Sequence, residues 1–289
     1  DTAFLAYDHV SPFFCRGVDR AAVKQAVSDF LKSQRRIDTV WISEPLGEAA
    51  WAREQGYDQL LSLPMVHVEL DGCQTLDEYA ARLSKKRRRN FRHDREQFAA
   101  AGAVVERHEG PLNPDQAPTD SERAARKKLL AELLKCLAAS AAHSELTVPY
   151  NNVLTDAEAF ADQRQTVLVA RVDGRAVGFM SFLTDGDRLL QCHGGLDYQR
   201  SHEVLAYHNL IYAGIELAIE RGCRVMSMGP LNNETKRRAG THLRPMVSSL
   251  WNRWPADRLI ARKLFIKNFE VFTGEVPADE QTADAPETK

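Results

Sequence analysis

A run of basic residues, "LSKKRRRNFRHDREQ", is the most concentrated charged stretch of the sequence. It places seven Lys and Arg side chains between Lys85 and Arg95, in a chain whose formal net charge is only -2. Such side chains bind phosphate groups through charge-assisted hydrogen bonds, but they also form ordinary solvated helix faces. Lys86, Arg87 and Arg88 are therefore candidate phosphate-binding residues, with a solvated face as the alternative.

Helical periodicity separates Arg87 from its basic neighbours. The apolar stripe of Leu76, Ala80 and Leu83 continues by steps of three and four to Arg87 and then Asp94. A desolvated arginine is costly unless it is paired or bound to a ligand. Arg87 is thus expected either to pair with a residue such as Asp94 or to face an anionic ligand.

Composition and cysteine usage limit the class of protein. The chain is 27% charged and 44% hydrophobic, as in ordinary soluble globular proteins. No apolar run approaches the ~20 residues that span a bilayer, so no integral membrane segment is expected. Five widely spread cysteines without a CxxC pair argue against a disulfide framework or zinc knuckle and favour a reducing cytoplasm. No HExxH spacing occurs, and we expect no metal.

The first 110 residues alternate between strand and helix patterns. Thr75 precedes a long helical pattern as a potential N-cap, Glu78 occupies the capping-box position and Gly102 ends the pattern. The sequence predicts one helix from Thr75 to Gly102. The remaining predicted elements are strands at 2–7, 38–43, 60–70 and 103–109 and helices at 20–31 and 51–56.

The second half predicts an α+β arrangement. A helix at 121–142 precedes three antiparallel strands, the first two joined by the Asp173 and Gly174 turn. A helix, a strand, a loop and another strand follow, which together indicate a mixed sheet with crossover helices. The predicted elements are strands at 165–172, 176–184, 188–194, 224–228 and 243–251, and helices at 203–221 and 257–272.

The proline-rich loop "GPLNPDQAPTD" suggests a division of the chain. We expect an N-terminal part at 1–110, a C-terminal domain at 111–275 and a disordered acidic tail at 276–289. Because the chain begins at Asp1 rather than Met, we also expect it to be part of a longer protein.

Two stretches resemble the acyl-CoA N-acyltransferase (GNAT) superfamily. They are "LSKKRRRNFRHDREQFAAAGAVV" and "AYHNLIYAGIELAIERGCRVMSMGPLNNETKRRAGTHLRPMVSSLW", and with their spacing they cover roughly residues 75 to 270. Their basic helix and their Gly, Glu-x-Lys, Gly and Arg-Pro pattern are similar to the Fem-like aminoacyltransferases and related peptidoglycan biosynthesis or recognition proteins. The resemblance implies a GNAT-like, mostly antiparallel mixed sheet flanked by helices. It also implies a partial second GNAT-like half at the N-terminus.

The resemblance leaves the acyl donor open. Acetyl-CoA-using members carry a Q/R-x-x-G-x-G/A loop whose amides hold the pyrophosphate at a helix N-terminus. Here "HGGLDYQRSHEV" occupies that place, and the phosphate spacing is absent. Gly194 and Gly195 could still let the backbone approach a donor closely. The donor implied is acyl-CoA, an acyl-carrier protein or aminoacyl-tRNA, with no tightly bound cofactor.

Lys236 and Glu234 match the Glu-x-Lys position of the family. The resemblance implies that Lys236 lies at the acyl-transfer site, where fixed positive charge stabilises the tetrahedral oxyanion or the leaving group. The alternative is a surface lysine in a basic loop. Glu234 could act as a general base toward an amine or pair with an arginine.

Proton transfer to and from the attacking amine and the leaving group requires further residues. His193 and Tyr207 are the candidates that the family arrangement places beside the site, with Glu203, His208 and Tyr212 nearby. Tyr207 and His208 are adjacent and cannot share one helix face, so at least one is structural. For His193 the alternative is a core residue.

These observations predict an N-acyl or aminoacyl transferase that acts on a small-molecule amine by direct attack. The acceptor could be a cell-wall precursor or a specialised metabolite. A non-catalytic module that holds RNA or another polyanion on the basic helix is the alternative function. Neither the acceptor nor the oligomeric state follows from the sequence.

Overall fold

The computed structural model describes residues 2–6, 20–37, 39–143, 160, 164–230, 234–254, 259 and 262–263. The helices in this part of the chain are α1 (Arg20–Ser33), α2 (Ala50–Glu54), α3 (Leu76–Arg82), α4 (Lys85–Ala100), α5 (Asp120–His143), α6 (Tyr198–Glu203), α7 (Ala206–Glu220) and α8 (Glu234–Arg238). The strands are β1 (Thr2–Ala6), β2 (Thr39–Pro45), β3 (Asp58–Glu69), β4 (Val104–Glu109), β5 (Gln165–Val172), β6 (Arg175–Asp185), β7 (Arg188–Leu196), β8 (Val225–Pro230) and β9 (His242–Asn252). Short 3-10 helices lie at Leu46–Glu48 and Pro114–Gln116.

The chain forms two compact units. Unit 1 contains residues 1–66 and 243–289, and unit 2 contains residues 67–242. The expected boundary near residue 110 lies inside unit 2, between β4 and α5. The acidic tail and most of the helix predicted at 257–272 lie outside the described residues.

Unit 1 is a small sheet with helices packed against it. Its strands follow the order β1, β2, β9, β3; β1 is parallel to β2, and β9 is antiparallel to β2. Val40, Ile42, Ala52 and Tyr57 form a buried cluster in this unit. A buried ion pair joins Lys24 to Glu44 at 2.6 Å beside that cluster.

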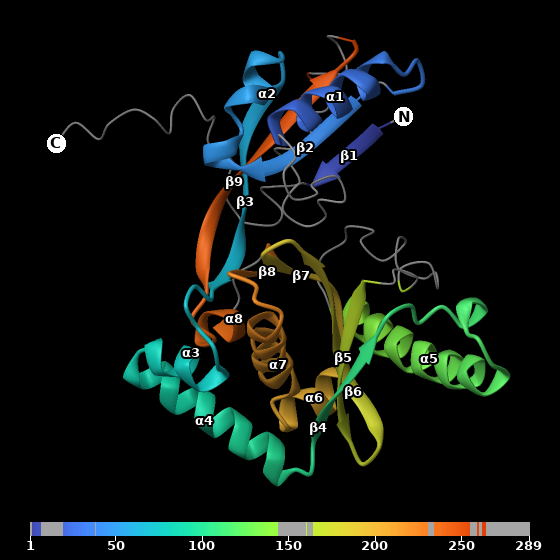
Figure 1. The fold of residues 1–289 in the computed structure, drawn as a ribbon, viewed down its shortest axis with the longest axis vertical. Helices are drawn as coiled ribbons and strands as arrows, with labels where there is room; N and C mark the ends of the chain where they lie inside the picture. Colours follow the sequence, from blue (N-terminus) through green and yellow to red (C-terminus); the bar gives the residue numbers. More distant parts are fainter. Residues whose placement is uncertain are drawn as a thin grey trace. The chain divides into compact units, whose positions relative to one another are not determined.

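Unit 2 contains the mixed sheet that the sequence predicts. Strands β4, β5, β6 and β7 are antiparallel to their neighbours in turn, and β8 is parallel to β7. Helix α5 covers one face of this sheet and α7 covers the other (Figure 1). The predicted hairpin turn is present, with both Asp173 and Gly174 at positive φ.

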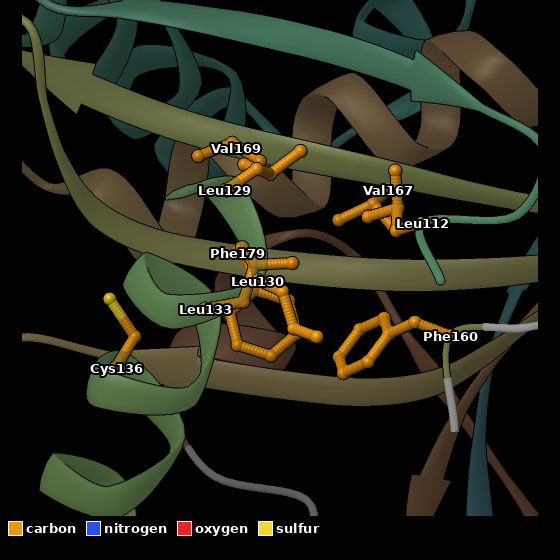
Figure 2. Packing of buried hydrophobic residues seen from close by; sticks show 9 residues of the cluster. All are labelled: Leu112, Leu129, Leu130, Leu133, Cys136, Phe160, Val167, Val169 and Phe179. Atoms are coloured by element: carbon orange, nitrogen blue, oxygen red, sulfur yellow. The ribbon is translucent and has the colours of Figure 1, made fainter. Parts of the chain in front are cut away.

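The core between α5 and the sheet consists mainly of aliphatic and aromatic side chains. Figure 2 shows the leucines of α5 directed at β5 and β6, with Phe160 beside Phe179. The rings of Phe160 and Phe179 lie 6.0 Å apart between centroids. Burial of this cluster fixes α5 against the sheet and leaves the opposite face to α7.

The long helix predicted from Thr75 to Gly102 is two helices. Thr75 caps α3 as predicted, since its hydroxyl accepts a hydrogen bond of 3.1 Å from the amide of Glu78. Leu83 is extended, with ψ at 151°, and Ser84 then caps α4 by accepting from the amide of Arg87. Gly102, at a φ of +65°, ends the region as predicted.

Candidate active site

Strands β7 and β8 diverge within unit 2. Strand β7 pairs with β6 to its end at Leu196, but its register with β8 covers only Arg188, Leu189 and Leu190. The last pair joins Leu190 to Ser227, so the final three residues of β8 are not in register with β7. Beyond this pair the two strands are no longer joined by a backbone ladder. Such a divergence is a candidate position for a ligand.

Lys236 is buried next to this divergence. It lies in α8 and is only 6% exposed, so the alternative of a surface lysine in a loop is wrong. Its ammonium Nζ donates a hydrogen bond of 2.6 Å to the backbone oxygen of Met228, the first β8 residue beyond the pairing with β7. Burial lowers the pKa of Lys236 to about 8. A lysine of this kind can supply positive charge at neutral pH and lose it a little above.

Glu234 is the first residue of α8, so the Glu-x-Lys pair lies within one helical turn. Residues 231–233, which connect β8 to α8, lie outside the described residues. The role of Glu234 as a general base stays a prediction.

An irregularity in β7 decides which way its residues face. Ser181 pairs with His193 whereas Phe182 pairs with Gln191, so Cys192 is an extra residue opposite β6. Such a bulge shifts the alternation of the side chains by one position. Gln191 and Gly194 consequently share the α7 face of the sheet, and His193 and Gly195 share the α5 face.

A glycine is needed at position 195 because of its packing against α5, not because of contact with an acyl donor. A Cβ atom there would lie 2.6 Å from the amide nitrogen of Leu137 and 2.8 Å from the carbonyl carbon of Cys136, both in α5. At Gly194 the nearest atom to such a Cβ, the carbonyl oxygen of Phe179, is 3.3 Å away. Gly194 therefore retains a possible role on the α7 face, while the backbone of α5 occupies the space beside Gly195.

His193 lies on the same face as Gly195 and contacts the core. Its ring makes an edge contact with Phe160 at 6.2 Å between centroids, and its amide donates to the hydroxyl of Ser181 at 3.1 Å. Helix α8 packs against α7 and α4, the helices of the opposite face. The structure thus separates His193 and Gly195 from Lys236.

Tyr207 is half-buried near the start of α7. The predicted helix 203–221 is interrupted before it, because Leu205 has a φ of +55° and divides α6 from α7. Tyr207 and His208 point to different sides, and His208 is structural: its Nε2 atom lies 3.1 Å from a guanidinium nitrogen of Arg238. Tyr207 remains a candidate for proton transfer from the α7 face.

The segment after β7 has no phosphate-binding loop. Helix α6, of six residues, begins after Asp197, whose carboxylate accepts a hydrogen bond from the amide of Arg200. In a coenzyme A site this helix terminus would hold the pyrophosphate. Here a carboxylate occupies it, and like charges in that position repel.

The basic surface of α4 consists of Lys85, Lys86, Arg87, Arg88, Arg89, Arg92 and Arg95. In the described part of the chain none of these seven side chains takes part in an ion pair. Arg88, Arg92 and Arg95 line a surface groove of about 800 Å³ together with Asp77 and Glu96. No acidic residue lies in the first turn of α4 to offset the helix dipole.

The proposed pair between Arg87 and Asp94 is wrong. Asp94 is fully buried, as the helical stripe predicts, but its carboxylate lies 3.4 Å from Arg238 and accepts from the hydroxyl of Tyr212 at 2.9 Å. Arg87 is half-buried at the start of α4. The contact of Arg87 with an anionic ligand stays a prediction, with a solvated helix face as its alternative.

Two polar groups at the divergence were not anticipated from the sequence. The hydroxyl oxygen of Ser227 and the side-chain oxygen of Gln191 are buried, and neither has a hydrogen-bond partner among the described residues. Ser227 belongs to the last pair between β7 and β8, and Gln191 follows Leu190, the partner of Ser227 in that pair. Buried polar atoms without a partner are rare in proteins, so these two offer hydrogen bonds to a ligand. Their position beside the divergence can be identified only from the observed register between β7 and β8.

The described residues contain no cluster of three or more His, Cys, Asp or Glu side chains suited to a metal ion. Within that same part of the chain, every helix is too short or too polar to cross a bilayer.

Comparison with known proteins shows the fold. No protein-family model matches the chain, and neither does any curated protein. Among solved structures, the C-terminal domain of a putative lysylphosphatidylglycerol synthetase from Agrobacterium fabrum aligns over 84% of this chain and 76% of its own, with a TM-score of 0.55 and 13% identity. L-PGS from Bacillus licheniformis aligns over 86% and 76%, with a TM-score of 0.53 and 14% identity. FemX aligns over 84% and 80%, with a TM-score of 0.55 and 13% identity.

These structures have the GNAT fold, and the chain has it too. The predicted fold class is confirmed, and so is the structural similarity to FemX. At sequence identities of 13% and 14%, the structural similarity shows the fold alone.

Proposed function

We propose that this chain is an N-acyl or aminoacyl transferase that moves an activated acyl group onto an amine by direct attack. The observation that carries the proposal is the position of Lys236. Its buried ammonium group lies on the carbonyl of Met228, one residue beyond the point where β7 and β8 separate. An acyl group held in that opening would meet a preorganised positive charge in a water-poor environment.

The reaction needs little from the protein besides position and charge. The acceptor nitrogen attacks the acyl carbon, an oxyanion forms, and the carbon–oxygen or carbon–sulfur bond to the leaving group then breaks. Lys236 in its charged form stabilises the oxyanion or the leaving group. The attacking nitrogen loses a proton, and Tyr207 and Glu234 are the candidates to transfer it.

The donor that the structure favours is an aminoacyl ester on tRNA. The carboxylate of Asp197 at the start of α6 opposes the pyrophosphate of coenzyme A. The seven cations of the basic surface supply phosphate contacts of the kind that a nucleic acid needs. Lys86, Arg87 and Arg88 would contact the donor there, and Gly194 would let its acyl end approach β7. An acyl-carrier protein is the remaining thioester alternative.

A second candidate function rests on the basic surface alone. The seven cations of α4, none of which takes part in an ion pair among the described residues, could hold RNA or another polyanion without catalysis. Binding of that kind weakens steeply with salt and does not depend on Lys236.

The dependence of the melting temperature on added ligand distinguishes the transferase from the polyanion-binding module. A ligand that binds only the folded state raises the melting temperature by mass action. We would measure melting with coenzyme A, an acyl-CoA panel, and aminoacylated and uncharged tRNA, and then test amide formation on a panel of small amines. The matched control for Lys236→Met is Lys128→Met on α5. Stabilisation by aminoacylated over uncharged tRNA, with turnover lost only in Lys236→Met, supports the transferase. Equal responses to both tRNAs without turnover support the binding module.

A further inference from the structure

The helix that carries Lys236 needs external contacts to stay folded. Helix α8 has five residues, whereas an isolated helix shorter than about 12 residues is marginal in water. Its orientation must therefore come from its neighbours. The contacts that fix α8 come from α3, α4 and α7, all within unit 2.

The side chain of Arg238 joins α8 to α4 and α7. One guanidinium nitrogen lies 3.4 Å from a carboxylate oxygen of Asp94, and the other lies 3.1 Å from Nε2 of His208. A guanidinium group only donates hydrogen bonds, so Nε2 of His208 is the acceptor and its ring is neutral. Burial, opposed by the charge of Asp94, lowers the pKa of His208 and favours this neutral ring.

Asp94 is held in turn by α7. Its second carboxylate oxygen accepts from the hydroxyl of Tyr212 at 2.9 Å, and its backbone oxygen accepts from the side-chain nitrogen of Asn209 at 3.0 Å. Tyr212 also packs against Phe91 with ring centroids 4.6 Å apart. Asp94 is completely buried, and a buried carboxylate with both oxygens engaged has little freedom to move.

The end of α8 is fixed separately by α3. The hydroxyl of Tyr79 donates to the backbone oxygen of Ala239. Gly240, at a φ of +87°, follows directly, and a side chain there would collide with Leu83. The chain leaving α8 is consequently held at two successive residues.

We infer that Asp94 and Arg238 are positioning residues that orient α8 and thereby hold the ammonium of Lys236 where β7 and β8 diverge. Lys236 and Arg238 are two residues apart, so they project about 200° from one another around the helix axis. The anchor thus faces α4 and α7 while the ammonium faces β8. The inference rests on the proposed function for its catalytic meaning, although the orientation itself can be tested without a substrate.

The test follows the reactivity of Lys236 toward acetic anhydride as a function of pH, read by mass spectrometry of its peptide. In the wild type the amine should titrate near its lowered pKa of about 8 and react slowly. In Asp94→Asn the midpoint should move toward the ordinary value of 10.5, and the rate at the alkaline plateau should rise severalfold. Asp71→Asn is the matched control, because Asp71 pairs with Arg224 on the exposed surface of the same unit.

A midpoint unchanged in Asp94→Asn, with only a lower melting temperature, would overturn the inference, since it would show a structural role alone. If Asp94→Asn does not fold, Arg238→Gln removes the same ion pair from a partly exposed position and must give the same shift. Failure of the proposed function looks different. There, Lys236 stays oriented and titrates as expected, yet Lys236→Met retains full transfer activity.

Discussion

The ammonium nitrogen of Lys236 lies 2.6 Å from the backbone oxygen of Met228, eight residues earlier in the chain. A charged hydrogen bond to a carbonyl offsets only part of the cost of removing an ammonium group from water. Burial therefore disfavours the charged form of Lys236 in the folded protein, in line with its lowered pKa. Such a cost is typical of a residue kept for function rather than for stability.

Lys236→Met should abolish acyl transfer while leaving the fold at least as stable. The lowering of the pKa from 10.5 to about 8 corresponds to about 3 kcal/mol of unfavourable burial of the charge. Methionine removes that cost and fills similar space, although it leaves the oxygen of Met228 without its donor, at about 1–3 kcal/mol. Urea denaturation at pH 7 should give an unchanged or higher free energy of unfolding. A decrease beyond about 1 kcal/mol would contradict this account.

The dependence of stability on pH should distinguish the wild type from Lys236→Met. Because the folded pKa lies below the unfolded one, the unfolded state binds more protons between about pH 8 and 10.5. The free energy of unfolding contributed by Lys236 must then rise with pH across that window, by about 3 kcal/mol in total. The difference between the two proteins, measured by denaturation at several pH values, should follow this rise. A difference in unfolding free energy that does not change with pH would mean that Lys236 is not desolvated.

Turnover should decrease as pH rises, whereas the free energy of unfolding contributed by Lys236 increases. In the proposed function charged Lys236 is the active form, so its contribution to rate should fall as pH rises through about 8. Lys236→Arg keeps the charge throughout, because the pKa of arginine exceeds ~12. The ratio of wild-type to Lys236→Arg turnover should decline above pH 8, a comparison in which the titration of the acceptor amine cancels. A constant ratio would argue against a role for the charge.

The sequence predicted much of the fold because its signals were local. The Thr75 cap and Gly102 stop are determined by hydrogen bonding and φ within a few residues, and both were found where predicted. The predicted inward position of Asp94 was also correct, because helical periodicity survived the break at Leu83. Ser84 was the available signal for that break, but Arg87 follows it where a capping box would have Glu or Gln.

The site was only partly predictable because it depends on distant contacts. Residues 94 and 238 are 144 positions apart, and nothing local indicates that Asp94 pairs with Arg238 rather than Arg87. The burial of Lys236 depends on how α8 packs against the rest of the unit. Which face of the sheet Gly194 and Gly195 lie on depends on the extra residue Cys192 in β7. Such features follow from tertiary packing, which overrides local patterns.

Gly195→Ala should destabilise the protein much more than Gly194→Ala. The new Cβ at residue 195 would press into the backbone of α5, which cannot move as a flexible side chain can. Overpacking of this kind costs about 1–3 kcal/mol. At residue 194 the contacts are ordinary to slightly tight, and the change should stay within about 1 kcal/mol. Equal unfolding free energies for the two variants would remove the packing explanation for Gly195 and return it to the donor site.

Charge reversal on the basic surface should change binding without harming the fold. Lys86 and Arg89 are exposed and make no ion pair among the described residues, so Lys86→Glu with Arg89→Glu breaks no such pair. Negative charge at residue 86, in the first turn of α4, also interacts favourably with the helix dipole, by about 0.3–1 kcal/mol. Thermal melting should therefore show equal or slightly higher stability.

Binding of tRNA by the same double variant should become weaker and less sensitive to salt. For every phosphate group that the variant no longer neutralises, the slope of log K against log salt should become shallower by about 0.7–0.9. The matched control is Lys127→Glu with Lys128→Glu, the same charge change on the exposed surface of α5 in the same unit. If both double variants reduce affinity and slope equally, the effect is one of net charge, and α4 is not a specific phosphate-binding surface. If only the α4 variant does so, the cations between Lys85 and Arg95 bind the phosphate backbone directly.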